Sequence, residues 1–177
     1  RKAIQLSTGM NALEYGCGTG LLSFALQSDL GQITLADSSQ GMLDVLSEKI
    51  NEAGVTNMRP VRLDLTNDPL PDEHYQLTYS LLTLHHVHDA KSIIPKFHAL
   101  LEPNGYLLVA DLDKEDGTFH TDGTTDVHKG FERAELQKWV EDAGFGNVMF
   151  STAFEIRKTI DDKEKVFPVF LMSAQKI

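Results

Sequence analysis

The segment Ala12–Gly20 constrains the fold of this chain more than any other stretch of its sequence. Three glycines, Gly16, Gly18 and Gly20, follow a short apolar run at two-residue spacing and precede the apolar segment 21–26. Glycine adopts positive φ without steric cost and has no Cβ, so its backbone can turn sharply and touch a ligand. The pattern therefore predicts a strand, a ligand-contacting loop and a helix, in that order.

The spacing of these glycines separates two kinds of nucleotide-binding loop. A dinucleotide fingerprint, G-x-G-x-x-G, would place its third glycine where Leu21 stands. Here the third glycine is Gly20, and the segment reads E-x-G-x-G-x-G from Glu14. This motif resembles the first motif of the class I S-adenosylmethionine-dependent methyltransferases. The resemblance implies that the three glycines pack against S-adenosylmethionine and that Glu14 lies near the methionine end of this cofactor.

Asp37 follows the second predicted strand. Its distance from the glycine loop is close to the offset of about 20 residues at which a carboxylate meets the ribose hydroxyls in nucleotide-binding α/β sheets. The segment from Asp37 to Met42 also matches the D-x-S-x-x-M pattern of small-molecule methyltransferases, and we place Ser38 and Met42 in the same cofactor site. The other interpretation is that Asp37 only caps the predicted helix at 42–53.

Asp64 and Leu65 follow the third predicted strand, at 58–63. The family resemblance implies that the carboxylate of Asp64 meets the adenine amino group and that Leu65 contacts the adenine ring. The alternative is that Asp64 begins an ordinary turn toward Pro69, since Asp and Asn are favoured in turns.

The fourth predicted strand, 74–80, leads into the most histidine-dense stretch of the chain, L-L-T-L-H-H-V-H. This segment resembles the fourth motif of the same family, and it departs from that motif at Gln76, where aspartate is usual. The fourth strand of such a sheet ends beside the first. We therefore expect Ser80 to contact the cofactor, and His85 or His86 to position the methyl acceptor or to take its proton.

The alternative for each histidine is an imidazole at the surface or core edge with no part in catalysis. If neither His85 nor His86 acts, the role passes to Asp111, His120 or His128, or to proximity alone. No metal site is predicted, because the histidines of one short loop lack well-spaced partners. Asp111, His120 and His128 are the residues that could converge with them.

The other segments complete an α/β pattern. They predict, in chain order, a helix from Ser92, a central strand at 106–110, a loop at 112–130 that closes over the site, a helix at 131–144, and a hairpin of strands 147–157 and 166–173. Five strand–helix units and a hairpin predict a Rossmann-like α/β fold. Its sheet is seven-stranded and mostly parallel, with helices on both faces and a C-terminal antiparallel hairpin. We expect one domain over residues 1–177 and a missing segment before Arg1, because the chain does not begin with methionine.

Charge limits the partners of this domain. The sequence has 16 basic and 26 acidic residues, a net charge of −10, which repels phosphate backbones and argues against DNA as a partner. Its one cysteine, Cys17, excludes an internal disulfide. The chain has no apolar run of the roughly 18 residues that a membrane span requires. We therefore expect a cytoplasmic protein without membrane contact, and the sequence leaves the oligomeric state open.

Taken with the family resemblance, these features predict the transfer of a methyl group from S-adenosylmethionine to a small-molecule acceptor. Two alternatives stay open: a non-catalytic, cofactor-binding scaffold subunit, and a methyltransferase that acts on a protein or tRNA. The sequence does not disclose the acceptor or the acceptor atom.

Overall fold

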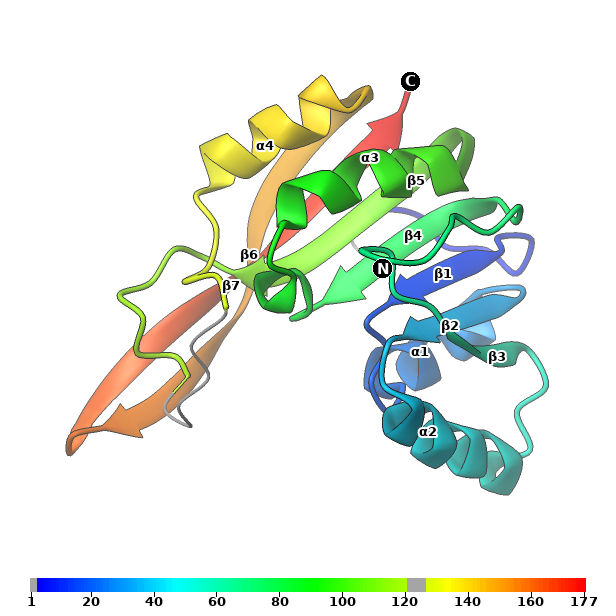
Figure 1. The fold of residues 1–177 in the computed structure, drawn as a ribbon, viewed down its shortest axis with the longest axis horizontal. Coiled ribbons are helices and arrows are strands. Elements are labelled where there is room, and N and C mark those ends of the chain that lie inside the picture. Colours follow the sequence, from blue (N-terminus) through cyan, green and yellow to red (C-terminus); the bar gives the residue numbers. More distant parts are fainter. Residues whose placement is uncertain (1–2, 121–126) are drawn as a thin grey trace.

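A computed structural model describes residues 3–120 and 127–177 and shows a seven-stranded sheet with the order β3-β2-β1-β4-β5-β7-β6 (Figure 1). All neighbouring strands pair in parallel except β7, which is antiparallel to both β5 and β6. The strands are β1 (Ala12–Tyr15), β2 (Ile33–Asp37), β3 (Met58–Arg62), β4 (Tyr75–Leu81), β5 (Leu101–Leu112), β6 (Phe145–Ile160) and β7 (Lys163–Lys176). The predicted seven-stranded, mostly parallel sheet with a terminal antiparallel hairpin is confirmed.

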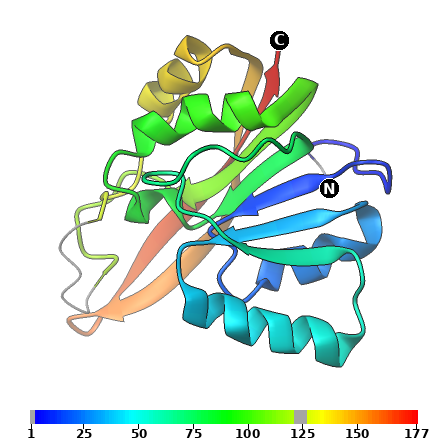
Figure 2. The ribbon, with the colours of Figure 1, turned by 45° about the vertical axis from the view of Figure 1, so that its right-hand side comes forward.

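Helices cover both faces of this sheet (Figure 2). One face carries α1 (Leu21–Leu26) and α2 (Gln40–Ala53), and the other carries α3 (Ala90–Leu100) and α4 (Arg133–Asp142). Short 3-10 turns, η1 (Gln27–Asp29) and η2 (Leu84–His86), follow α1 and precede α3.

Successive side chains of a strand point to opposite faces of the sheet, so β1 contributes to a hydrophobic core on each face. Ala12 packs in a core with Leu46 of α2, whereas Leu13 packs in a separate core with Phe97 of α3. All four residues of β1 are buried, as expected for a central strand that helices cover on both sides.

The structure corrects the prediction of five strand–helix units. Residues 63–74 connect β3 to β4 without a helix, because prolines 69 and 71 and their acidic neighbours favour turns. The helix expected from Ser92 begins at Ala90, where the carboxylate of Asp89 accepts a hydrogen bond from the Ser92 amide at 3.2 Å. Pro95 therefore lies inside α3, where it removes a single backbone donor.

The terminal hairpin is longer than predicted. Its turn is only Asp161 and Asp162, and both have positive φ, as a two-residue hairpin turn of type I′ requires. Aspartate tolerates this conformation better than most residues, which explains why the strands extend to the turn without a glycine.

Part of the predicted lid at 112–130 lies outside the described residues, namely 121–126, which includes Gly123. Before this gap the chain runs from the end of β5 to His120, and after it the backbone amide of His128 donates to the carbonyl of His85 at 2.7 Å. The described part of the segment therefore packs on η2. Across 3–120 and 127–177, no helix is both long enough and apolar enough to span a membrane.

The order of the strands reverses between β1 and β4, which are hydrogen-bonded neighbours. In open α/β sheets, ligands bind outside the carboxyl ends of the strands at such a reversal. Here the glycine loop follows β1, and η2 follows β4. The fold thus brings these two segments, which are about 65 residues apart in the sequence, to one edge of the sheet.

Phe97 tests how far the fold depends on the α3 layer. Its side chain is fully buried and meets the ring of Tyr15 edge-on, with centroids 5.5 Å apart. We expect Phe97→Ala to lower the free energy of unfolding by about 3–5 kcal/mol, through lost burial and a cavity. Met149→Ala, at a side chain that is 60% exposed, is the control and should change it by no more than about 0.5 kcal/mol. If urea denaturation gave the two variants equal losses in the free energy of unfolding, the assignment of Phe97 to the core would be contradicted.

Candidate functional site

A pocket of about 620 Å³ opens at the carboxyl ends of β1 to β4. This volume is in the range of small-molecule sites, about 300–1,000 Å³. Its walls come from the glycine loop, the end of β2, the start of α2, the turn after β3, and the segment around η2. The lining residues are Tyr15, Gly16, Gly18, Asp37, Ser38, Ser39, Met42, Asp64, Thr66, Asn67, Leu82, Thr83, His86, Val87 and His88.

The three glycines of the loop have different tasks. A Cβ at Gly16 would lie 2.0 Å from Cγ2 of Thr83, so this glycine lets the loop pack against the chain after β4. A Cβ at Gly20, the residue before α1, would lie 2.5 Å from Cδ1 of Leu46. At Gly18 a Cβ would meet no atom within 4 Å, and this residue lines the pocket. Gly18 is therefore the glycine that offers bare backbone to a ligand.

Asp37 links the glycine loop to α2. One oxygen of its carboxylate accepts a hydrogen bond from the amide of Gly18 at 2.8 Å, and the other accepts one from the amide of Ser39 at 2.9 Å. Ser39, in turn, is the N-cap of α2, with its hydroxyl accepting from the amide of Met42. The capping role that the alternative gave to Asp37 belongs to Ser39, and Asp37 faces the pocket.

Asp64 sits at the pocket edge after β3 and organises a tight turn. Its carboxylate accepts hydrogen bonds from the amide of Thr66 and from the side chain of Asn67, each at 2.8 Å. Desolvation acts to raise the pKa of Asp64, but these hydrogen bonds together outweigh it and hold the pKa below its ordinary value. The carboxylate is therefore charged at neutral pH. Asp64 thus begins a turn, as the alternative predicted, and also lines the pocket.

The predicted cofactor residues fall into two groups in the structure. Six of them line the pocket: Gly16, Gly18, Asp37, Ser38, Met42 and Asp64. Four lie outside its lining: Glu14, Gly20, Leu65 and Ser80. Leu65 and Ser80 are buried in the protein interior, and Leu65 belongs to the core on the α3 side. A direct cofactor contact for these four stays a prediction that the geometry does not favour.

Glu14 is a buried carboxyl group beneath the loop. Ser23 of α1 donates a hydrogen bond to it, and the hydroxyls of Ser23 and Tyr79 are also hydrogen-bonded to each other. Burial raises the pKa of Glu14 to about 7, against the opposing effect of the Ser23 hydrogen bond, and the nearby charge of Asp37 adds to the rise. In this structure the glutamate thus joins β1, α1 and β4 rather than facing the pocket.

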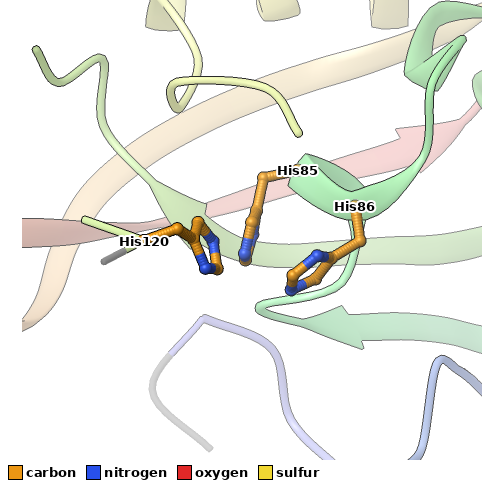
Figure 3. Close-up of side chains that lie close together, drawn as sticks. All are labelled: His85, His86 and His120. Carbon is orange, nitrogen blue, oxygen red and sulfur yellow. The ribbon is translucent and has the colours of Figure 1, made fainter. Parts of the chain in front are cut away.

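The two histidines that were predicted to be catalytic lie in different environments. His86 is exposed and lines the pocket, whereas His85 is only 2% exposed. Nδ1 of His85 donates to the buried carboxylate of Asp111 at 2.6 Å. His120 approaches both rings from the far end of the segment after β5, with ring centroids 5.2 Å from His85 and 5.1 Å from His86 (Figure 3). His128 lies nearby, where its Nε2 contacts the carbonyl of His88 at 3.0 Å.

Sequence reasoning missed part of the pocket wall. Leu82 and Thr83 form it after β4, and Leu82 has a positive φ of 51°. This conformation is unfavourable for a bulky residue and is typical of turns at functional sites. It turns the chain so that the hydroxyl of Thr83 donates to the carbonyl of Gly16 at 3.2 Å. No signal in the sequence marks a left-handed leucine, so this contact emerges only from the fold.

Residues 12–105 match the sequence profile of the methyltransferase domain family. The chain belongs to this family of class I S-adenosylmethionine-dependent methyltransferases. The match covers the glycine loop, Asp37, Asp64 and both η2 histidines, and ends before Asp111 and His120. The residues predicted to bind the cofactor thus all lie within the matched region.

Relatives of this chain come from several organisms. An uncharacterized methyltransferase of Schizosaccharomyces pombe is 37% identical over 120 residues, which cover 64% of this chain and 42% of that protein. The ubiquinone/menaquinone biosynthesis C-methyltransferase of Shewanella sediminis is 34% identical over 110 residues, covering 60% and 44% of the two chains. This chain therefore spans less than half the length of these curated relatives.

Solved structures carry the same fold. A SAM-dependent methyltransferase from Aquifex aeolicus superposes with a TM-score of 0.73 at 21% identity, covering 99% of this chain and 87% of that one. At this identity the likeness extends to the architecture, which is the seven-stranded sheet described above.

S-adenosylmethionine is the cofactor of this family, and the pocket has features that suit it. Gly18 presents backbone that a ligand can approach closely, and the carboxylates of Asp37 and Asp64 stand at two separate strand ends. Ionised carboxylates are acceptors only, which matches the hydroxyl and amino donors of a nucleoside. By contrast, a smaller hollow of about 300 Å³ at the amino ends of the strands, beside Arg59 and His74, has no such loop.

The raised pKa of Glu14 predicts a pH-dependent stability. Between its unfolded pKa of 4.5 and its folded pKa of about 7, the native state binds more protons than the unfolded state. The free energy of unfolding should therefore fall as pH rises through this window, by up to about 3 kcal/mol from this group. Glu14→Gln keeps the shape but cannot ionise, so its stability should lack this component.

The measurement is urea denaturation of both proteins at pH 5 and pH 8. Comparing the two cancels the contribution of every other titrating group. The free energy of unfolding of Glu14→Gln should rise relative to that of the unmodified protein between pH 5 and pH 8. Parallel pH profiles would show that the native carboxyl group titrates as it does in the unfolded chain.

Proposed function

We propose that this methyltransferase transfers a methyl group from S-adenosylmethionine to a small-molecule acceptor bound beside η2. The single observation that carries the proposal is the pocket at the β1–β4 reversal, into which Gly18 opens between the carboxylates of Asp37 and Asp64. The family assignment supplies the cofactor, and the geometry supplies a site of suitable size at the place where such sheets bind ligands.

The roles follow from the position of each group. Asp37 would accept from the ribose hydroxyls, Asp64 from the adenine amino group, and Gly18 would allow the backbone to approach the ligand. Ser38 and the half-exposed Met42 would form the wall on the α2 side. When bound, S-adenosylmethionine supplies an electrophilic methyl group, and the protein has to hold an acceptor in line with it.

The acceptor would lie at the opposite end of the pocket, formed by Thr83, His86, Val87 and His88. In our proposal His86 touches and orients the acceptor, because it is the member of the predicted pair that lines the pocket. His85 is buried behind His86, and Asp111 holds its imidazole in place. In this proposal His85 is a positioning residue that does not touch the acceptor. Acceptance of a proton by either histidine stays a prediction from the sequence.

The net charge of −10 favours a small molecule over tRNA, because an acidic surface repels a phosphate backbone. A protein acceptor and a non-catalytic scaffold are the other candidates, and turnover of a small molecule would decide against the scaffold. We further propose that residues 1–177 act as one domain. The expectation of a cytoplasmic protein stays a prediction from the sequence.

Gly18→Val tests cofactor binding. The new side chain would project into the pocket where Gly18 now offers bare backbone, so we expect S-adenosylmethionine binding to disappear in calorimetry. Gly54→Val is the matched control, since Gly54 also has a positive φ and open space around a Cβ, and it lies outside the pocket lining. Asp37→Asn should weaken binding by about 1–3 kcal/mol through loss of charged hydrogen bonds.

Loss of binding in both glycine variants would show general damage to the fold, and circular dichroism would detect it. Unchanged binding in Gly18→Val, with the fold intact, would place the cofactor elsewhere.

His86→Gln tests the acceptor end of the pocket. Glutamine keeps hydrogen-bonding capacity but changes its geometry, so we expect turnover to fall roughly 10²-fold with cofactor affinity nearly unchanged. The assay measures methyl transfer from labelled S-adenosylmethionine to a panel of phenols, quinols, amines and carboxylic acids. His74→Gln, at an exposed histidine outside the pocket lining, is the control. Full activity of His86→Gln on an accepted substrate would remove His86 from the acceptor site.

A further inference from the structure

Three imidazoles from two distant segments meet beside the pocket. His85 and His86 come from η2, and His120 comes from the segment after β5 (Figure 3). One ring nitrogen of each lies within 4.8 Å of one ring nitrogen of each of the other two. The sequence predicted no metal site, because the loop histidines lack well-spaced partners along the chain, but it named His120 among the residues that could converge with them.

Asp111 fixes the form of His85. Because Nδ1 donates to the Asp111 carboxylate at 2.6 Å, a neutral His85 carries its lone pair on Nε2. Among the residues that the structure describes, Nε2 of His85 has no hydrogen-bond partner, although it is buried. A neutral imidazole that binds a carboxylate through one nitrogen and presents the other is the usual arrangement of a metal-ligating histidine.

The surroundings of Asp111 support the same interpretation. Its carboxylate is fully buried and accepts hydrogen bonds from the amides of Leu112 at 2.8 Å and of His85 at 3.3 Å, besides the imidazole. These three donors hold the carboxylate in place, and the carboxylate in turn holds the ring of His85 with Nε2 available to a metal ion.

We propose that His85, His86 and His120 bind one divalent transition-metal ion, with Zn²⁺ the best match. Imidazole nitrogens suit Zn²⁺, whereas Mg²⁺ and Ca²⁺ prefer oxygen ligands. Three histidines leave a position of a tetrahedral Zn²⁺ for water or another ligand. A tetrahedral ion at about 2.0–2.1 Å from each nitrogen requires nitrogens roughly 3.4 Å apart, so modest side-chain rotations would close the cluster.

Both segments that carry the ligands are anchored, which limits the cost of closing the site. The residue before His120, Phe119, is buried against Phe167 of β7 with ring centroids 5.2 Å apart. Nζ of Lys158 in β6 donates to the carbonyl of Phe119 at 2.7 Å and lies over its ring. The η2 segment is held by Asp111 at the end of β5.

The site would stand at the edge of the pocket, since His86 is both a ligand and a lining residue. Two ligands lie within the region that matches the methyltransferase domain profile, and His120 lies beyond it. The proposal does not rest on methyl transfer, because it concerns metal binding by the ligand-free chain.

The test uses the full chain without an affinity tag, treated with a chelator and then dialysed against Zn²⁺. We expect one zinc per chain by elemental analysis, with saturable binding in calorimetry. His120→Ala should weaken Zn²⁺ binding at least 10-fold, and Asp111→Asn should weaken it about 10–100-fold through loss of ligand orientation. His74→Ala, at an exposed histidine outside the cluster, should bind Zn²⁺ as the unmodified chain does.

Cobalt provides an independent readout of the ligand geometry. Bound Co²⁺ should show the intense visible absorption of a tetrahedral nitrogen-ligated ion, and His120→Ala should lose it. Absence of saturable Zn²⁺ binding to the unmodified chain would overturn the proposal whatever the variants do. Equal loss of binding in His74→Ala and His120→Ala would also overturn it, because this would indicate surface histidines as the ligands.

Discussion

The architecture of the site depends on the close contact between the loop after β1 and the chain after β4. Gly16 has no side chain to separate them, and the hydroxyl of Thr83 reaches its carbonyl group. Leu82 takes a left-handed conformation to make this contact, and its amide is held by the carbonyl of Ala110 in β5 at 2.8 Å. Three adjacent strands are thus tied together at the edge where the pocket opens.

Two kinds of polar group meet across this edge. The β1–β3 side presents the carboxylates of Asp37 and Asp64, while the β4–β5 side presents imidazoles supported by Asp111. Below them, a protonatable carboxyl at Glu14 joins the strands to α1. The division follows the strand order, because a reversal at β1 and β4 gives each half of the sheet its own part of the pocket.

The sequence predicted the fold and the residues of the glycine loop well, because glycine spacing and apolar periodicity are local signals. It also predicted the strand ends at Asp37 and Asp64. It failed where tertiary contacts decide: the helix-free connection at 63–74 and the burial of Ser80 and Leu65. It named His120 among the residues that could converge with the loop histidines, without predicting that it meets His85. These features depend on how segments that are far apart in the sequence pack together. The spacing of residues in a single sequence does not give the distance between such segments in the fold.

The two hydrogen bonds of Asp37 bear on the thermodynamics of recognition. By holding the amide of Gly18 on one oxygen and that of Ser39 on the other, the carboxylate orders the loop and the start of α2 during folding, before any ligand arrives. The conformational entropy of this wall is therefore already lost in the free protein, and association is spared that cost. A nucleoside would meet this ordered wall and share the carboxylate of Asp37 as an acceptor, so its affinity would derive from pre-organisation as much as from new contacts.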